Sequence, residues 1–247
     1  MSRFFSHTYH IDTRDLDVFD ACRPSAVLGY LQDVAGLASE DFGGANPQMI
    51  AKYRHCWMLA RTQFTLTRPL RLHDALELKT WHRGGDSAVM YRDTDLLVDG
   101  KPVGEALASW VLADLDTRAL SRMSAFPELQ GTDGGALNRT TRLRPLRLPD
   151  GLPEVERRTF HYSDLDVNGH ANNTRYADLL CDALALHSAP AGAFVTGLRL
   201  NYLKECHAGE VLTLKAGWQG EDGLVSGQGE NGEVRFTGAL TLSKTFP

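Results

Sequence analysis

The chain contains the tetrapeptide Asp-Leu-Asp-Val twice, first at residues 15–18 and again at 164–167. One four-residue match is weak evidence, but similar patterns follow both copies in the same order. Each copy is followed by apolar residues at helical spacing and then by alternating apolar stretches, which end alike as LELKTW and LTLKAGW. This ordered repetition indicates a duplicated fold, so a unit of about half the chain has to fold twice.

Each copy predicts one helix followed by an antiparallel sheet. The first helix begins at Arg23-Pro24-Ser25 and ends at Gly43-Gly44, whereas Asn172-Asn173 supply capping side chains for the second, which Pro190 ends. The predicted strand regions are 57–81, 88–98, 101–113, 193–218, 223–228 and 233–243, with hairpin turns at Asp99-Gly100 and Asn231-Gly232. A curved sheet can wrap a single amphipathic helix of four or five turns. The expected fold class is therefore α+β, a tandem (double) hotdog in which each half is a long helix wrapped by a curved antiparallel sheet.

A segment rich in Pro, Gly and Arg separates the two copies and lacks clear periodicity, which is typical of a linker. We therefore expect an N-terminal hotdog at residues 1–125, a linker at 126–152 and a C-terminal hotdog at 153–247.

Composition excludes several other classes of protein. With 43% hydrophobic and 23% charged residues the chain is an ordinary globular one, and its net charge of −5 argues against nucleic acid as a partner. Because it has neither a run of about 18 apolar residues nor a leader pattern, we expect no membrane association and a cytoplasmic location. Its four cysteines are widely scattered and form no CxxC pair, so neither a metal nor another cofactor is expected.

The second copy carries polar residues that suit catalysis. If residues 164–171 are extended, alternate side chains share one face, and Asp166, Asn168 and His170 then lie together. A carboxylate, an amide and an imidazole would converge just before a helix, where free backbone N–H groups and the helix dipole suit a developing oxyanion.

The first copy presents Asp17, Phe19 and Ala21 at the matching positions, so we expect it to be catalytically silent. The alternative for the second copy is a polar turn that caps its helix without any chemistry, because Asn and Asp favour such turns.

The stretch DLDVNGHANNTRY at 164–176 resembles the D-x-N-x-H…N-N-x-x-Y signature of the acyl-acyl-carrier-protein (acyl-ACP) thioesterases, which include the plant chain-terminating enzymes. The resemblance continues in order with LKEC at 203–206 and, in the first half, with YLQDVA at 30–35 and WVL…TRALSR at 110–122. It departs from the plant pattern at Gly169 and Ala171, where the plant enzymes usually carry Gln and Val. The family's catalytic set then falls on Asp166, Asn168, His170 and Glu205.

The resemblance implies a division of labour within this set. His170 and Glu205 would form an acid/base pair, in which Glu205 orients or activates a water molecule and His170 protonates the leaving thiolate. Asn168 would polarise the thioester carbonyl, and Asp166 would act either as nucleophile or as general base. A competing hypothesis makes Cys206 a nucleophile beside His170, but a lone cysteine is more often a small buried residue.

Two further sets of residues are candidates for substrate binding. The resemblance assigns the acyl pocket to the N-terminal half, with Leu31, Val34, Trp57 and Met58 as candidates, although a core role suits them equally. A cluster of arginines that includes Arg142, Arg144 and Arg147 predicts docking of an acidic carrier protein, unless it is simply a solvated linker.

The expected function is a thioester hydrolase that releases free fatty acid from acylated acyl carrier protein in fatty acid biosynthesis. A hotdog acyl-CoA or aroyl-CoA thioesterase is the alternative, and a non-catalytic acyl-binding module is a third reading that the retained polar set disfavours. The sequence specifies neither the acyl chain length nor the oligomeric state, and it leaves a homodimer open.

Overall fold

The computed structural model describes residues 4–83, 87–130, 134–135 and 143–243. The chain divides into two compact units, of which the first comprises Met1–His10, Tyr30–Phe64 and Asp74–Arg144, and the second Ile11–Gly29, Thr65–His73 and Pro145–Pro247. Two short segments of the first half therefore group with the second half. Whether residues 1–125 and 153–247 fold as separate domains, joined by a linker at 126–152, stays a prediction.

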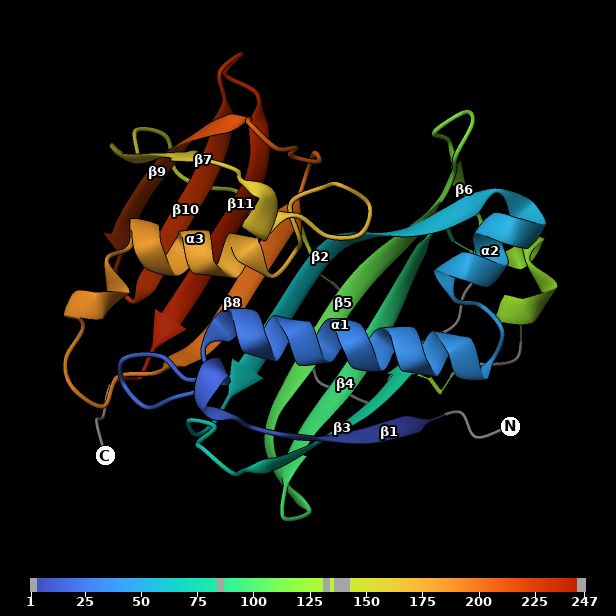
Figure 1. Ribbon diagram of the computed structural model, residues 1–247, viewed down its shortest axis with the longest axis horizontal. Coiled ribbons are helices and arrows are strands. Elements are labelled where there is room, and N and C mark those ends of the chain that lie inside the picture. The colour runs from blue at the N-terminus through green and yellow to red at the C-terminus, as the bar shows by residue number, and fades with distance from the viewer. Residues whose placement is uncertain (1–3, 84–86, 131–133, 136–142, 244–247) are drawn as a thin grey trace. The chain divides into compact units, whose positions relative to one another are not determined.

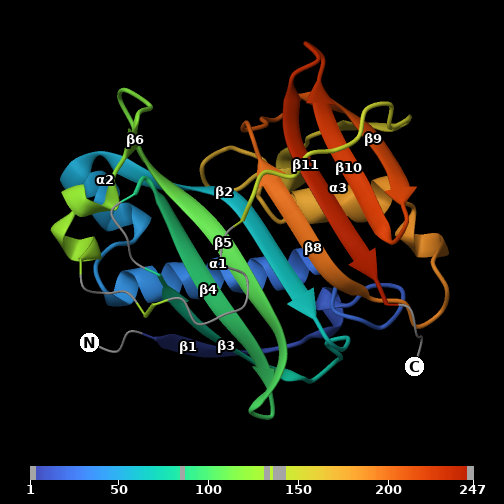
Figure 2. The same cartoon turned by 180° about the vertical axis from the view of Figure 1, so that it is seen from behind.

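The first unit is a sheet with one long helix against it. The helix α1 (Pro24–Asp41), whose residues up to Gly29 group with the second unit, covers one face of this sheet (Figures 1 and 2). The strands are β1 (Phe5–His10), β2 (His55–Leu66), β3 (Ala75–His82), β4 (Val89–Val98), β5 (Lys101–Asp114) and β6 (Leu120–Ser121). Their order is β1-β3-β4-β5-β2, and β6 pairs with β5.

The predicted periodicity accounts for α1 and for the hairpin between β4 and β5. The buried residues Val27, Leu28, Val34, Ala35 and Ala38 repeat along one side of α1, as expected of an amphipathic helix. At the hairpin, Asp99 and Gly100 both have positive φ, as a two-residue turn between antiparallel strands requires. A second helix in this unit, α2 (Asn46–Tyr53), was not predicted.

The second unit has the same architecture with a shorter helix. Its strands are β7 (Glu154–Thr159), β8 (Val195–Tyr202), β9 (Val211–Gln219), β10 (Asp222–Gly229) and β11 (Val234–Leu242), all antiparallel and ordered β8-β11-β10-β9-β7. The helix α3 spans only Arg175–Ala183, because Ala185 turns left-handed and a short 3₁₀ turn follows before Pro190. The expectation of four or five helical turns is thus right for α1 and wrong for α3. Together these features confirm the predicted α+β hotdog fold.

The predicted linker is partly built into the fold. Phe126 and Leu129, at its start, lie in a buried cluster of the first unit with Met49, Leu112 and Met123. Further on, the carbonyl of Leu146 faces the side chains of Asn201 and Thr237 on the second sheet, at 3.5 Å from each. Gly238, the neighbour of Thr237, faces α3, so residues near 146 run along the opposite face of this sheet (Figure 2).

Helix α3 packs directly onto β11 at Gly238. An added Cβ there would lie 2.6 Å from a methyl carbon of Leu180, a fully buried residue that would have to shift. We therefore expect Gly238→Ala to lower the free energy of unfolding by about 1–3 kcal/mol, as overpacking does. Gly36→Ala is the matched control, because nothing lies within 4 Å of its added Cβ and alanine favours the helix α1. Urea unfolding that ranks Gly36→Ala as the less stable variant would contradict this packing.

Within the described residues, no helix is long and apolar enough to cross a membrane. The four cysteines, all of which lie among the described residues, form no disulfide, and Cys22 and Cys206 are buried.

Candidate active site

The loop that carries the polar residues is a tight turn and not the extended segment that we predicted. Leu165 and Ala171 form an antiparallel bridge, and within it the Asp166 N–H donates to the His170 carbonyl at 2.8 Å. The Gly169 N–H donates to the Asp166 carbonyl at 3.0 Å, and Gly169 itself has a φ of 74°. The polar side chains are therefore brought together by this turn and not by strand alternation.

The carboxylate of Asp166 organises this turn. Its Oδ1 accepts hydrogen bonds from the backbone N–H groups of Asn168 at 2.8 Å and His170 at 3.4 Å. Its Oδ2 lies 3.5 Å from the side-chain amide nitrogen of Asn168. A side-chain acceptor for two backbone donors makes the turn more favourable than a strand, which explains why the extended prediction was wrong.

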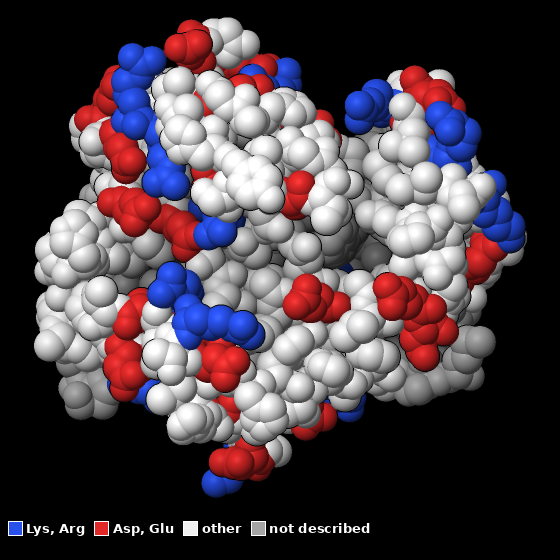
Figure 3. Space-filling view, in the orientation of Figure 1, with Lys and Arg blue, Asp and Glu red and all other residues white. Residues whose placement is uncertain are grey.

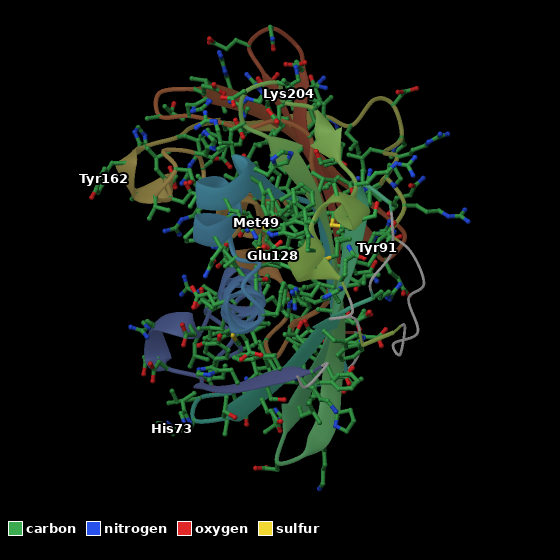
Figure 4. The ribbon with its side chains drawn as sticks, turned by 90° about the vertical axis from the view of Figure 1, so that its right-hand side faces the viewer. Met49, His73, Tyr91, Glu128, Tyr162 and Lys204 are labelled. Carbon is green, nitrogen blue, oxygen red and sulfur yellow. The ribbon has the colours of Figure 1, made fainter. Side chains whose placement is uncertain are left out.

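The first copy of Asp-Leu-Asp-Val folds into the same turn. The Asp17 N–H donates to the Ala21 carbonyl at 2.8 Å, and Oδ1 of Asp17 accepts from the N–H groups of Phe19 at 2.9 Å and Ala21 at 3.2 Å. Asp20 has positive φ at the position of Gly169. Both turns belong to the second unit, and each follows a short 3₁₀ turn. Tyr162, in the 3₁₀ turn of the second copy, points outward into solvent (Figure 4). The duplication therefore extends to individual hydrogen bonds.

The same correspondence aligns the segments that face the two turns. In the first copy the Cys22 N–H donates to the Leu70 carbonyl, and in the second the Ala171 N–H donates to the Cys206 carbonyl, both at 2.8 Å. Leu70 thus matches Cys206, and the residue before it, Pro69, matches Glu205. The first turn therefore has no counterpart of Asn168, His170 or Glu205.

In the second copy His170 and Glu205 lie side by side. Nδ1 of His170 is 3.6 Å from Oε1 of Glu205, and the two side chains are 31% and 36% exposed, so both remain accessible to a substrate. Glu205 lies in the loop after β8 and not within a strand, and its carbonyl accepts a hydrogen bond from the Arg235 guanidinium at 3.4 Å. The neighbouring Lys204, which is labelled in Figure 4, forms an ion pair with Glu233. A carboxylate beside an imidazole suits proton transfer and the stabilisation of an imidazolium.

A second histidine, to which no motif of the sequence points, also lies at this site. His207 forms an antiparallel bridge with His170, and the ring centroids are 4.8 Å apart at 85°. The two histidines are distant in sequence, and no local motif spacing links them. Only the alignment of the facing segments would have indicated their proximity.

Cys206 is a buried structural residue. It is fully inaccessible to solvent, and burial raises the pKa of its thiol, although the Tyr176 hydroxyl partly offsets this by donating to the sulfur. A protonated and inaccessible thiol is a poor nucleophile. The geometry therefore favours Glu205 over Cys206 as the partner of His170.

We accordingly expect Cys206→Ser to keep kcat within a few-fold of the wild type, whereas Glu205→Ala should lower it by about 10² or more. Steady-state hydrolysis of an acyl thioester measures both. Stoichiometric labelling of Cys206 by a thiol reagent, accompanied by full inactivation, would restore the hypothesis of a cysteine nucleophile.

The acyl-pocket candidates all belong to the first unit. Leu31 and Val34 lie on α1, where Val34 is fully buried, and Trp57 and Met58 lie on β2. The Trp57 indole donates to the Gly44 carbonyl at 2.8 Å and packs against the buried cluster around Met49. Because neighbouring residues of a strand point to opposite faces, Trp57 and Met58 do not line one side of a pocket together. The assignment of the pocket stays a prediction.

Of the arginine cluster, Arg142 lies outside the described residues, while Arg144 and Arg147 are exposed. On the face seen in Figure 3, Lys and Arg side chains are intermixed with Asp and Glu. Docking of a carrier protein at these arginines stays a prediction.

Comparisons with known proteins agree with the resemblance seen in the sequence. The chain is 27% identical over 227 residues to the chloroplastic palmitoyl-acyl carrier protein thioesterase of Gossypium hirsutum, covering 84% of this chain and 53% of that protein. It is 26% identical over 247 residues to the chloroplastic dodecanoyl-[acyl-carrier-protein] hydrolase of Cinnamomum camphora, covering 90% and 62%. The chain thus spans roughly half to three fifths of the length of these relatives.

Solved structures share the fold over nearly the whole chain. An acyl-ACP thioesterase from Bacteroides thetaiotaomicron superposes with a TM-score of 0.84 at 19% identity, covering 98% of this chain and 100% of that one. The 12:0-ACP thioesterase from Umbellularia californica gives 0.85 at 19% identity, covering 98% of each. The model of the acyl-ACP thioesterase N-terminal domain matches residues 2–126, and that of the C-terminal domain matches residues 152–235. The chain therefore belongs to the acyl-ACP thioesterase family.

Proposed function

We propose that this protein hydrolyses fatty acyl thioesters of acyl carrier protein and that the site around His170 is where it does so. The observation that carries the proposal is the pairing of Nδ1 of His170 with Oε1 of Glu205 at 3.6 Å, next to the turn that holds Asn168. The matching turn of the first copy lacks all three groups, so one chain provides one working site.

Each side chain has a role that its position supports. Glu205 orients or activates the attacking water molecule, or stabilises the imidazolium form of His170, and His170 protonates the leaving thiolate. Asn168 is exposed at the tip of the turn, where its amide can polarise the thioester carbonyl. Its nitrogen lies 3.5 Å from Oδ2 of Asp166, which helps to orient the amide.

Asp166 is better explained as a positioning residue than as a nucleophile or general base. Its Oδ1 is occupied by two backbone N–H groups, and Asp17 makes the same two contacts in a turn that has no catalytic partners. An aspartate found in both turns with the same hydrogen bonds is explained by the turn itself. We therefore propose a positioning role for Asp166 in place of the nucleophile or general base that the resemblance implies.

The names of two relatives support acyl carrier protein as the carrier of the acyl group. Relatives from Gossypium hirsutum and Cinnamomum camphora are named for palmitoyl- and dodecanoyl-ACP substrates, which supports an acylated carrier protein as partner. The cytoplasmic location and a homodimer stay predictions.

Steady-state assays with matched substrates test the proposal. We expect release of free thiol from palmitoyl- or dodecanoyl-ACP with a kcat/KM at least about tenfold above that for the CoA ester with the same acyl group, since contacts with the carrier add to transition-state binding. A preference for the CoA ester would replace this function by that of an acyl-CoA thioesterase, and no hydrolysis of either would leave only the acyl-binding reading.

A further inference from the structure

Three side chains that suit metal binding converge beside the catalytic pair. His170, Glu205 and His207 each offer a nitrogen or oxygen atom, and these atoms lie within 4.8 Å of one another. All three residues belong to the second unit, two of them to the segment after β8 and one to the turn before α3. The proposed hydrolysis uses His170 and Glu205 but assigns nothing to His207.

The backbone fixes the two imidazoles opposite each other. His170 and His207 face each other in an antiparallel bridge. The hydrogen bond from the Ala171 N–H to the Cys206 carbonyl joins the residues next to this pair, not the two histidines. The histidines are therefore a non-hydrogen-bonded pair, the kind in which facing Cα atoms are only about 4.5 Å apart. The near-perpendicular rings, with centroids 4.8 Å apart, follow from this backbone arrangement.

The distances suit a small transition-metal ion. Zinc binds imidazole nitrogen at about 2.0–2.1 Å and carboxylate oxygen at about 2.0–2.2 Å, so neighbouring ligand atoms around a tetrahedral ion are about 3.4 Å apart. The 3.6 Å between Nδ1 of His170 and Oε1 of Glu205 is close to that value. The ligand atoms of the triad lie within 4.8 Å of one another, about an ångström more than a tetrahedral zinc ion requires. Because His207 is exposed, its ring can move closer by that amount.

The donor types narrow the choice of metal. Two imidazoles and one carboxylate are a donor set of zinc sites that keep a fourth position for water, and imidazole also suits copper and nickel. Magnesium and calcium prefer oxygen ligands throughout. Since His170 and Glu205 are about one-third exposed, an ion can reach them from solution.

We propose that His170, Glu205 and His207 bind Zn²⁺ and that the bound ion blocks hydrolysis. Binding occupies the imidazole and the carboxylate that proton transfer requires, so a chain that holds the ion has no free acid/base pair. The inhibition rests on the proposed function, whereas the binding itself does not. The first turn presents Ala21, Pro69 and Arg71 at the corresponding positions and offers no such ligands.

Titration calorimetry with ZnCl₂ on the chelator-treated full chain tests the binding. The wild type should bind Zn²⁺ at this triad, and His207→Ala or Glu205→Gln should weaken the affinity at least tenfold, because loss of an outer-shell partner alone costs about 10–100-fold. His187→Ala, an exposed histidine of the same unit outside the triad, should bind as the wild type does. MgCl₂ should give no binding at this site. No zinc binding by the wild type, or equal affinity for the wild type and His207→Ala, would overturn the proposed site.

A second measurement tests inhibition, using the ratio of hydrolysis rates with and without zinc within each variant. Saturating Zn²⁺ should slow the wild type at least tenfold, EDTA should restore the rate, and His207→Ala should need at least tenfold more zinc for half inhibition. Zinc that binds the triad and leaves hydrolysis unchanged would overturn the inhibitory role. If the chain hydrolyses no thioester at all, the proposed function fails while calorimetry still decides the metal site.

Discussion

His170→Ala is expected to lower kcat for acyl-ACP hydrolysis by roughly 10²–10⁴, the usual contribution of a general acid or base. The imidazole of His170 lies beside Glu205, so it can take a proton from Glu205 or water and deliver one to the leaving thiolate. Its side chain is about one-third exposed, so its removal leaves no large cavity and the fold should survive.

The control for this variant is His187→Ala, which removes an exposed histidine of the same unit that lies outside the site. It should keep near-wild-type kcat. Urea unfolding should give both variants a free energy of unfolding within about 0.5 kcal/mol of the wild type. Near-full activity of His170→Ala would remove this residue from the mechanism.

Asp166→Ala is expected to lower kcat by about 10²-fold, because the turn that aims Asn168 and His170 loses its acceptor and a displacement of about 1 Å has that effect. Asp166→Asn should stay within about tenfold of the wild type, since its amide oxygen can still accept from the two backbone N–H groups that Oδ1 serves now.

The duplicated turn supplies a matched control for this experiment. Asp17→Ala removes the same two hydrogen bonds in the first copy and should cost similar stability, about 1–3 kcal/mol, yet leave kcat within a few-fold. Urea unfolding and steady-state hydrolysis of the two alanine variants give both quantities. If Asp166→Asn is as inactive as Asp166→Ala, Asp166 reacts chemically and is not merely a positioning residue.

The sequence predicted the architecture well because both halves repeat one pattern of apolar spacing. The helical spacing of apolar residues in α1 and their alternation in the strands indicate which side chains are buried. These side chains form the core between the helix and the sheet. The predicted length of α3 was too great, because the helix ends where Ala185 adopts a left-handed conformation. Glycine is the usual residue at such a position, so an alanine there does not indicate the end of a helix. The helix α2 and the burial of Phe126 arise from tertiary packing that composition does not register.

The sequence indicated candidate residues for the site but not how they are arranged. The family resemblance proposed His170 and Glu205 as a pair, and their Nδ1 and Oε1 atoms lie 3.6 Å apart in the structure. The turn at Asp166 was missed because period-two reasoning ignores a side chain that takes up backbone donors. His207 was missed because its proximity to His170 depends on the register between two distant segments.

The most direct test of the account is a double-mutant cycle on His170 and Glu205, followed through kcat with acyl-ACP. Residues that act as one unit give losses that do not multiply. Nδ1 of His170 and Oε1 of Glu205 are 3.6 Å apart and are proposed to act as one acid/base pair. The double variant His170→Ala/Glu205→Ala should therefore have about the same kcat as the slower single variant. Losses that multiply, or a single variant with near-wild-type kcat, would contradict a single acid/base pair in the second copy.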